Sequence, residues 1–371
     1  MRLALLFLLL APGWLAVRAD SSEDRVKQAA AAYQSGDIAT AIRLYRDFLK
    51  DYPDAAEIRS NLGAALVRNG QFADAITEYS LALRKLPNNP AVRMNLALAY
   101  YKLGRLPEAV ADLESLRKLR PLDLKPALLE ADCLLAMDQP QKAVDVLSPM
   151  QEDNPDDRAL IYMLGMALLK DKRTADAQVL LDRILRDGES AESAFLLGQS
   201  ALLRSDLVTA TAQLARAIQL NPKMPWVHSL YGQALKSAGK GEEATAQFNE
   251  ELKLNPYDFT ANTETAVLLR QDGKLDEALA RINRALEVRP KDPGALYERA
   301  SIHMRQGQTD EARRELEDLL HDYPNFSEAH AALATAYYRL KRIADGDRET
   351  AEARRVREEA QKQLEEKRAK P

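Results

Sequence analysis

The four histidines and the single cysteine are the side chains best suited to bind a metal ion or to act as a nucleophile. They are His228, His303, His321, His330 and Cys133, and none of them belongs to an HExxH or CxxC motif. The sequence also lacks GxGxxG, a phosphate-binding loop and GxSxG. Acidic residues are abundant, but lysine and arginine stand beside them, as on solvated helix surfaces. We therefore expect no enzymatic activity, no bound metal and no small-molecule cofactor.

The overall charge argues against nucleic acid as a partner. The chain carries 52 basic and 56 acidic residues, a formal net charge of −4, and the two signs are interspersed. A nucleic-acid-binding protein usually shows a basic excess or a basic face. Apolar residues make up 46% of the chain and aromatic residues only 6%, so a core of closely packed helices rich in alanine and leucine is expected.

The first nineteen residues resemble a secretory signal peptide. Arg2 precedes an apolar run from Leu3 to Ala11, and Pro12 interrupts the apolar character before a short cleavage motif that ends at Ala19. We predict cleavage near Ala19 and a periplasmic or secreted protein. The alternative is an uncleaved anchor, which would be the only reason for membrane association, but the apolar segment is short for a span of roughly 20 residues. Because the exported chain has one cysteine, packing rather than disulfides must stabilise it.

Prolines reveal an internal repeat. In two series they recur at intervals of 34 residues, and the series are separated by 67 residues, one short of two periods. The prolines are Pro53, Pro87, Pro121, Pro155, Pro222, Pro256, Pro290 and Pro324. A deletion of one residue in the fifth unit accounts for the shorter interval, and we expect an irregular joint near residues 186–189.

Three further columns repeat with the prolines. When proline is position 32, the units start near residues 22, 56, 90, 124, 158, 191, 225, 259, 293 and 327. Position 8 is then always glycine or alanine, position 20 is alanine in the first nine units, and position 24 is large and apolar. This pattern predicts two helices of about fourteen residues per unit, a length that is marginal for an isolated helix. Small residues let the two helices approach closely, and proline ends the second helix.

These columns resemble the tetratricopeptide repeat family. The second unit carries the pattern most completely, at Leu62, Gly63, Gly70, Ala75, Tyr79, Ala82 and Pro87. The resemblance covers residues 22–340, although the family's tryptophan at position 4 is missing from every unit. It implies an all-α, right-handed superhelical solenoid of about ten helix-turn-helix hairpins.

The segment 341–371 differs from the repeats, because 18 of its 31 residues are charged. We predict a polar C-terminal capping helix from Arg348 to about Lys367 that covers the last hairpin. A coiled-coil or membrane-surface helix is the alternative, but the apolar stripe is thin and the charges are mixed.

The resemblance implies that protein or peptide partners bind on the concave face formed by the first helix of each hairpin. An apolar anchor site is predicted at Tyr162, Met166, Phe195 and Trp226. The alternative is that these residues belong to the core. Basic residues at position 13 would flank the groove and favour acidic partners, and asparagines at position 6 would bond a peptide backbone. These flanking candidates are Arg68, Lys102, Arg305, Asn61 and Asn95.

The function predicted from the sequence is that of an exported, non-catalytic scaffold in a bacterial envelope assembly. The alanine-rich, cysteine-poor composition is the basis for a bacterial origin. One alternative is a eukaryotic secretory-pathway co-chaperone, for which Asn325 begins a glycosylation sequon. Another alternative is an accessory subunit of a carbohydrate-processing enzyme.

Overall fold

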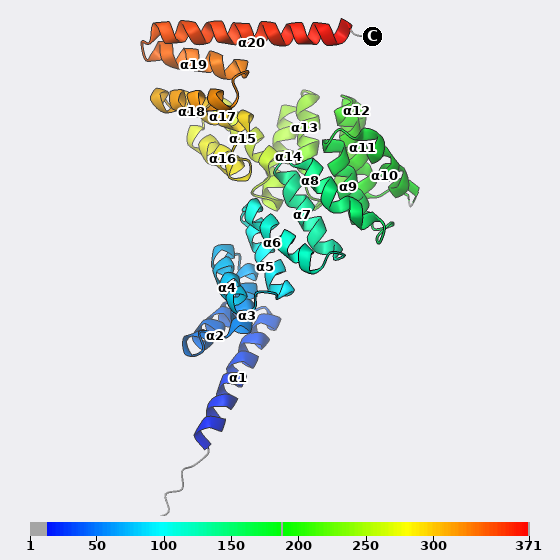
Figure 1. Cartoon of the computed structure of the whole chain (residues 1–371), viewed down its shortest axis with the longest axis vertical. Coiled ribbons are helices and arrows are strands. Elements are labelled where there is room, and N and C mark those ends of the chain that lie inside the picture. Colours follow the sequence, from blue (N-terminus) through cyan, green and yellow to red (C-terminus); the bar gives the residue numbers. More distant parts are fainter. Residues whose placement is uncertain (1–12, 187, 370–371) are drawn as a thin grey trace, which may run out of the picture. The chain divides into compact units, whose positions relative to one another are not determined.

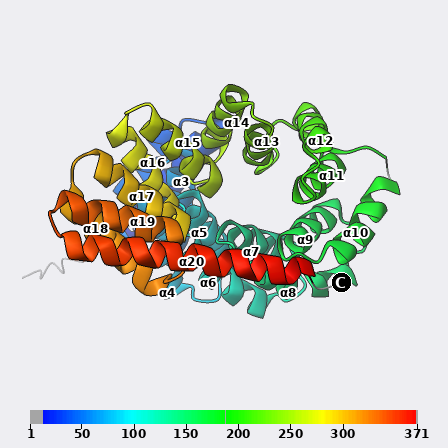
Figure 2. The same ribbon diagram turned by 90° about the horizontal axis from the view of Figure 1, so that it is seen from above.

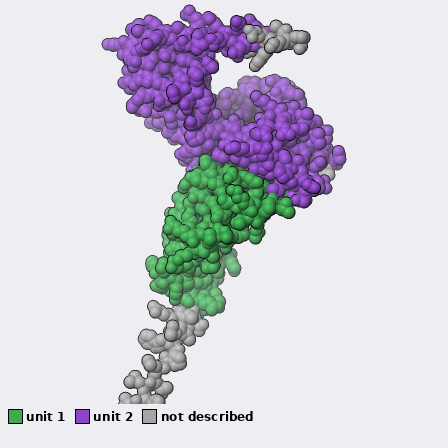
Figure 3. Space-filling model, in the orientation of Figure 1, with its two compact units in different colours: residues 1–133 green, residues 134–371 purple. Residues whose placement is uncertain are grey.

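A computed structural model describes residues 13–186 and 188–369. Within these ranges the chain forms twenty α-helices, one short 3₁₀ helix and no strand, which confirms the all-α prediction (Figure 1). The chain divides into two compact units, residues 1–133 and 134–371 (Figure 3). The boundary between them falls within α7 (Leu124–Ala136).

The helices form successive antiparallel pairs. Up to the boundary they are α1 (Gly13–Ser35), α2 (Ile38–Asp51), α3 (Ala56–Arg68), α4 (Phe72–Lys85), α5 (Pro90–Lys102) and α6 (Leu106–Leu119). Beyond α7 the chain continues with α8 (Pro140–Leu147), η1 (Ser148–Gln151), α9 (Arg158–Lys170), α10 (Thr174–Arg186), α11 (Ala191–Leu203), α12 (Leu207–Leu220), α13 (Val227–Ser237) and α14 (Gly241–Leu254). The last six helices are α15 (Phe259–Gln271), α16 (Leu275–Val288), α17 (Pro293–Arg305), α18 (Thr309–Asp322), α19 (Ser327–Arg339) and α20 (Ile343–Ala369).

The helix starts follow the period of the sequence. The helices α3, α5, α7, α9, α11, α15, α17 and α19 each begin at the residue where the period places a unit start. The helix α13 begins at Val227 instead of residue 225, because Trp226 has a left-handed backbone with φ of 64°. The helix α10 has 13 residues, whereas α12 and α14 have 14, so the deletion in the fifth unit shortens its second helix.

The small residue at position 8 provides the closest approach within each hairpin. A Cβ atom added to Gly63 would lie 2.7 Å from the Tyr79 ring, and one added to Gly232 would lie 2.6 Å from the Phe248 ring. Tyr79 and Phe248 occupy position 24 of the same hairpins, and both are 1% exposed. The residue at position 24 therefore packs over position 8 of its own hairpin. The sequence analysis had placed it only between neighbouring hairpins.

A polar side chain at position 4 links three segments where the family has tryptophan. In the second unit, Arg59 donates hydrogen bonds of 3.0 and 2.8 Å to the Pro53 carbonyl and one of 2.7 Å to Glu78. Pro53 precedes α3 and Glu78 lies on α4, so the side chain connects the incoming loop to both helices of the hairpin. The same arrangement recurs at Arg93 with Pro87 and Asp112, at His228 with Pro222 and Gln247, and at His330 with Pro324 and Glu349.

The C-terminal helix α20 packs against α19. Ala353 and Val356 are buried, whereas residues 358–363 are exposed, so only the first part of the helix covers the last hairpin. His330 on α19 is 2.6 Å from Glu349 on α20, and Tyr338 donates a hydrogen bond of 2.8 Å to Asp347. The helix begins five residues earlier than predicted.

Most of the predicted signal segment lies outside the described residues, since α1 begins at Gly13. Its cleavage stays a prediction. None of the helices within residues 13–186 and 188–369 combines the length and the apolar character needed to cross a membrane.

The contact between position 8 and position 24 can be tested by adding one methyl group. Gly232→Ala should destabilise the protein by about 1–3 kcal/mol, because the new Cβ would overlap the Phe248 ring. Urea unfolding followed by far-UV circular dichroism measures the change. Gly241→Ala is the control, because no atom lies within 4 Å of its added Cβ. Equal urea midpoints for the two variants would contradict the packing argument.

Candidate functional site

A cavity of about 80 Å³ lies in the second unit, on the inner side of consecutive hairpins. Figure 2 shows the hairpins α9–α10, α11–α12, α13–α14 and α15–α16 following one another along a curve. Most of the lining comes from α9, α11 and α13, the first helices of their hairpins, and from the segment that leads into α15. The residues used below are Leu135, Met166, Lys170, Phe195, Gln199, Trp226, Ser229, Asp258, Phe259 and Arg289.

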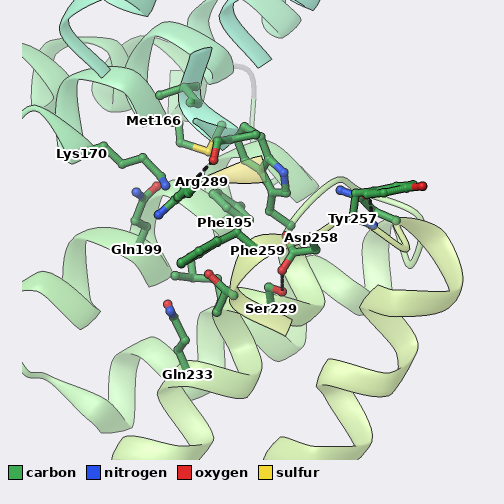
Figure 4. A pocket seen from close by; sticks show the side chains of 16 residues that line it. Met166, Lys170, Phe195, Gln199, Ser229, Gln233, Tyr257, Asp258, Phe259 and Arg289 are labelled. Carbon is green, nitrogen blue, oxygen red and sulfur yellow. Dashed lines mark hydrogen bonds between the residues drawn. The ribbon is translucent and has the colours of Figure 1, made fainter. Parts of the chain in front are cut away.

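Arg289 connects two distant parts of this curve. It directly follows α16, and its Nε donates a hydrogen bond of 2.7 Å to the carbonyl of Ala136, 153 residues earlier (Figure 4). Ala136 is the last residue of α7, where carbonyls have no partner within the helix and carry the negative end of the helix dipole. The guanidinium also lies 4.1 Å from the centre of the Phe259 ring. These contacts close the curve from the end of α7 to α16 into a ring.

Two cations reach the cavity. Lys170 ends α9, and its Nζ lies 5.9 Å from the centre of the Trp226 ring. Lys170 is exposed by surface area, but the surrounding helices reduce its hydration, which lowers its pKa, and the charge of Arg289 lowers it further. Burial likewise lowers the pKa of Arg289. Neither side chain forms a salt bridge with any residue in the described ranges.

Two buried carboxyl groups lie behind this surface. Asp258 caps α15 and accepts hydrogen bonds of 2.6 Å from the Ser229 hydroxyl and 2.7 Å from the Ala261 amide. Glu251, which is 1% exposed, accepts longer bonds of 3.4 and 3.3 Å from the amides of Trp226 and Ser229 at the start of α13. The short bonds favour the ionised form of Asp258.

Burial raises the pKa of Glu251 to about 8, and the negative charge of Asp258 contributes to the rise. Burial also raises the pKa of Asp258, although the bonds from Ser229 and Ala261 oppose the rise. Glu251 therefore carries the proton of the pair at neutral pH. A neutral Glu251 avoids the desolvation of a second charge within the hairpin.

Three residues of the predicted apolar anchor are buried. Tyr162 is 6% exposed, while Met166 and Phe195 are each 1% exposed. The Tyr162 and Phe195 rings meet edge to face with centroids 5.3 Å apart. These three side chains therefore belong to the core, the alternative that the sequence left open. Only Trp226 among the four is half-exposed at the cavity.

The other predicted groove residues lie away from this cavity. Asn61 and Lys102 are exposed and Asn95 is half-buried, all in the first unit. Arg68, also in that unit, donates a hydrogen bond of 2.8 Å to the Tyr33 carbonyl, so part of its donor capacity serves the contact between hairpins. Arg305 is exposed in the second unit. Partner binding by these residues stays a prediction.

The sequence did not identify Gln199, Asp258 or Arg289 as site residues. Arg289 is the residue before a repeat proline, a position with no periodic preference that would single it out. Lys170 stood in the basic column at position 13, and that column was the one available signal. Within the described residues, no group of three or more histidine, cysteine or carboxylate side chains could hold a metal ion.

The buried carboxyl pair predicts a specific dependence of stability on pH. The pKa of Glu251 rises from its ordinary value of 4.5 to about 8 in the folded protein, so the unfolded chain ionises first as pH increases. The wild-type melting temperature should consequently fall between pH 5 and pH 8 relative to that of Glu251→Gln, which cannot ionise. Thermal unfolding at the two pH values measures the difference.

Glu250→Gln is the matched control, because Glu250 is exposed on the same helix and Lys253 lowers its pKa. This variant should keep the decline in melting temperature that is attributed to Glu251. Parallel pH profiles of the wild type and Glu251→Gln would show that the carboxyl of Glu251 is not the cause.

Comparison with known proteins identifies the repeats. One profile described as tetratricopeptide repeat matches residues 66–133, 134–198 and 269–336, and a second with the same description matches residues 26–90 and 231–295. No curated protein matches the sequence.

Several solved structures are similar. Yeast Tom70 is 16% identical with a TM-score of 0.37, and the match covers 91% of this chain and 92% of Tom70. MamA is 16% identical with a TM-score of 0.40, covering 45% and 97% of the respective chains. Human IFIT1, solved as a dimer with PPP-AAAA, is 14% identical with a TM-score of 0.48, covering 88% and 89%. On the basis of the profile matches over most of its length, the chain belongs to the tetratricopeptide repeat family.

Proposed function

We propose that this protein is an exported, non-catalytic scaffold that binds protein partners on the inner face of its helical repeats, within a bacterial envelope assembly. The observation that carries the proposal is the tetratricopeptide array that extends over most of the chain. Proteins of this family generally act as non-catalytic scaffolds for other proteins. The assembly and the partners belong to the proposal.

The cavity of the second unit supports binding on the inner face. Its lining comes mostly from the first helix of each hairpin, the surface on which the sequence predicted partners to bind. It combines apolar side chains with two cations, and its half-exposed tryptophan is a residue type enriched at binding hot spots.

The amino-terminal sequence supports export. Residues 1–19 have the charged start, apolar run and small residue at the cleavage position of a signal peptide. The eukaryotic alternative is favoured by one observation, the exposure of Asn325 in the sequon between α18 and α19. A shift in mobility after treatment of the native protein with an N-glycosidase would support that alternative.

Export can be tested on the full-length chain with a C-terminal tag in its native cells. The exported protein should begin at Asp20 when its amino terminus is sequenced, and Leu6→Arg should prevent trimming by interrupting the apolar run. Asp24→Arg, a charge change beyond the predicted cleavage point, is the control. Recovery of only the untrimmed wild-type chain would contradict cleavage. The trimmed protein should then capture envelope proteins in a pull-down, and failure to capture any would contradict the scaffold proposal.

A further inference from the structure

The cavity has more free hydrogen-bond donors than acceptors. Lys170 has three N–H groups, and its printed contact within the described residues is with the Trp226 ring. Arg289 uses Nε for the Ala136 carbonyl, which leaves the N–H groups of its two Nη atoms. Asp258 is the only carboxylate in the lining, and its Oδ1 already accepts two hydrogen bonds. A ligand that accepts hydrogen bonds and carries negative charge would suit this set.

The carboxylates near the two cations do not neutralise them directly. Asp138 interacts electrostatically with both Lys170 and Arg289, but it is exposed and does not line the cavity. Asp292 acts on Arg289 while its side chain caps α17. Figure 4 shows the ends of Lys170, Gln199 and Arg289 directed to a common region of the cavity.

Gln199 adds one buried acceptor to this region. The residue is 6% exposed, and its Oε1 has no hydrogen-bond partner among the described protein atoms. A buried acceptor without a partner is unfavourable, and an N–H group from a ligand would satisfy it. A peptide supplies a carboxylate and a main-chain N–H at neighbouring positions, whereas a simple organic acid supplies only the carboxylate.

The size and floor of the cavity limit the group that enters. Its volume of about 80 Å³ is the space of two to three water molecules, at roughly 30 Å³ each. Leu135, Met166 and Phe195 form apolar parts of the lining and are at most 1% exposed. A carboxylate with a short aliphatic stem meets both conditions.

We propose that this cavity binds a carboxylate group of an extended peptide, with Lys170 and Arg289 as its cationic partners and Gln199 as the acceptor of a main-chain N–H. The carboxylate is that of an acidic side chain or of the peptide's C-terminus. This inference rests on the proposed function, since it names the chemistry of the partner that the inner face would hold.

Trp226 allows a direct measurement. The sequence has two tryptophans, so the Trp14→Phe protein contains Trp226 alone. Its fluorescence is titrated with four compounds: an acetylated tripeptide amide with a central glutamate, the glutamine equivalent as an amide, the glutamine equivalent with a free C-terminus, and sodium acetate. At least one of the two carboxylate-bearing peptides should change the emission saturably and bind more tightly than the neutral peptide and acetate. Which of them does so identifies the source of the carboxylate.

Lys170→Gln in this background should weaken that binding by roughly tenfold or more, because it removes a charge-assisted contact. Lys142→Gln makes the same charge change at an exposed position of α8 and should leave binding unchanged. Circular dichroism verifies that both variants remain folded. Equal binding of the neutral and acidic peptides, acetate binding as tight as peptide binding, or equal losses in the two lysine variants would each overturn the proposal.

A pull-down separates this inference from the scaffold function. If the wild-type chain captures no envelope protein, the proposed function fails. If wild type and Lys170→Gln capture the same partners equally, the scaffold stands and the carboxylate site is overturned.

Discussion

Every hairpin depends on the contact between a small residue on its first helix and a large residue on its second. Helices of 13 or 14 residues have little stability in isolation, so each acquires its stability from packing. At Gly63 and Gly232 the rings of Tyr79 and Phe248 occupy the space where a Cβ would be. Because this contact brings the two backbones together, it also sets where the first helix presents its opposite face. The inner surface of the array is therefore a consequence of packing within each hairpin.

The polar residues at position 4 solve a second problem, the attachment of each hairpin to the loop before it. Arg59, Arg93, His228 and His330 donate to or contact a proline carbonyl and a polar group on the second helix. A tryptophan could fill the same space but could not bond both partners. Two of the four histidines are thus accounted for by structure rather than by chemistry. Their roles were not visible in the sequence, where only the absence of metal-binding spacing could be recognised.

The sequence predicted the local structure far better than the site. The columns at positions 8, 20, 24 and 32 repeat in the chain, and eight first helices begin where the period indicates. The side chains of Tyr162, Met166 and Phe195 fall in columns that face the groove in the family, yet here they are buried. The contact of Arg289 with Ala136 spans 153 residues, and it arises from the summed rotations of several hairpins. Such a sum depends on small differences at each joint, which a residue pattern does not encode. The left-handed Trp226 is one of those joints.

The closure made by Arg289 has a mechanical consequence. In a simple stack each hairpin touches only its neighbours, so the array stretches and recoils like an open spring, one joint at a time. A bond from the end of α16 back to the end of α7 fixes the circumference of the turn between them. Any widening of one joint in that turn must be matched by narrowing at another or by rupture of the bond. The segment between Ala136 and Arg289 therefore behaves as a stiff collar within an otherwise extensible chain of repeats.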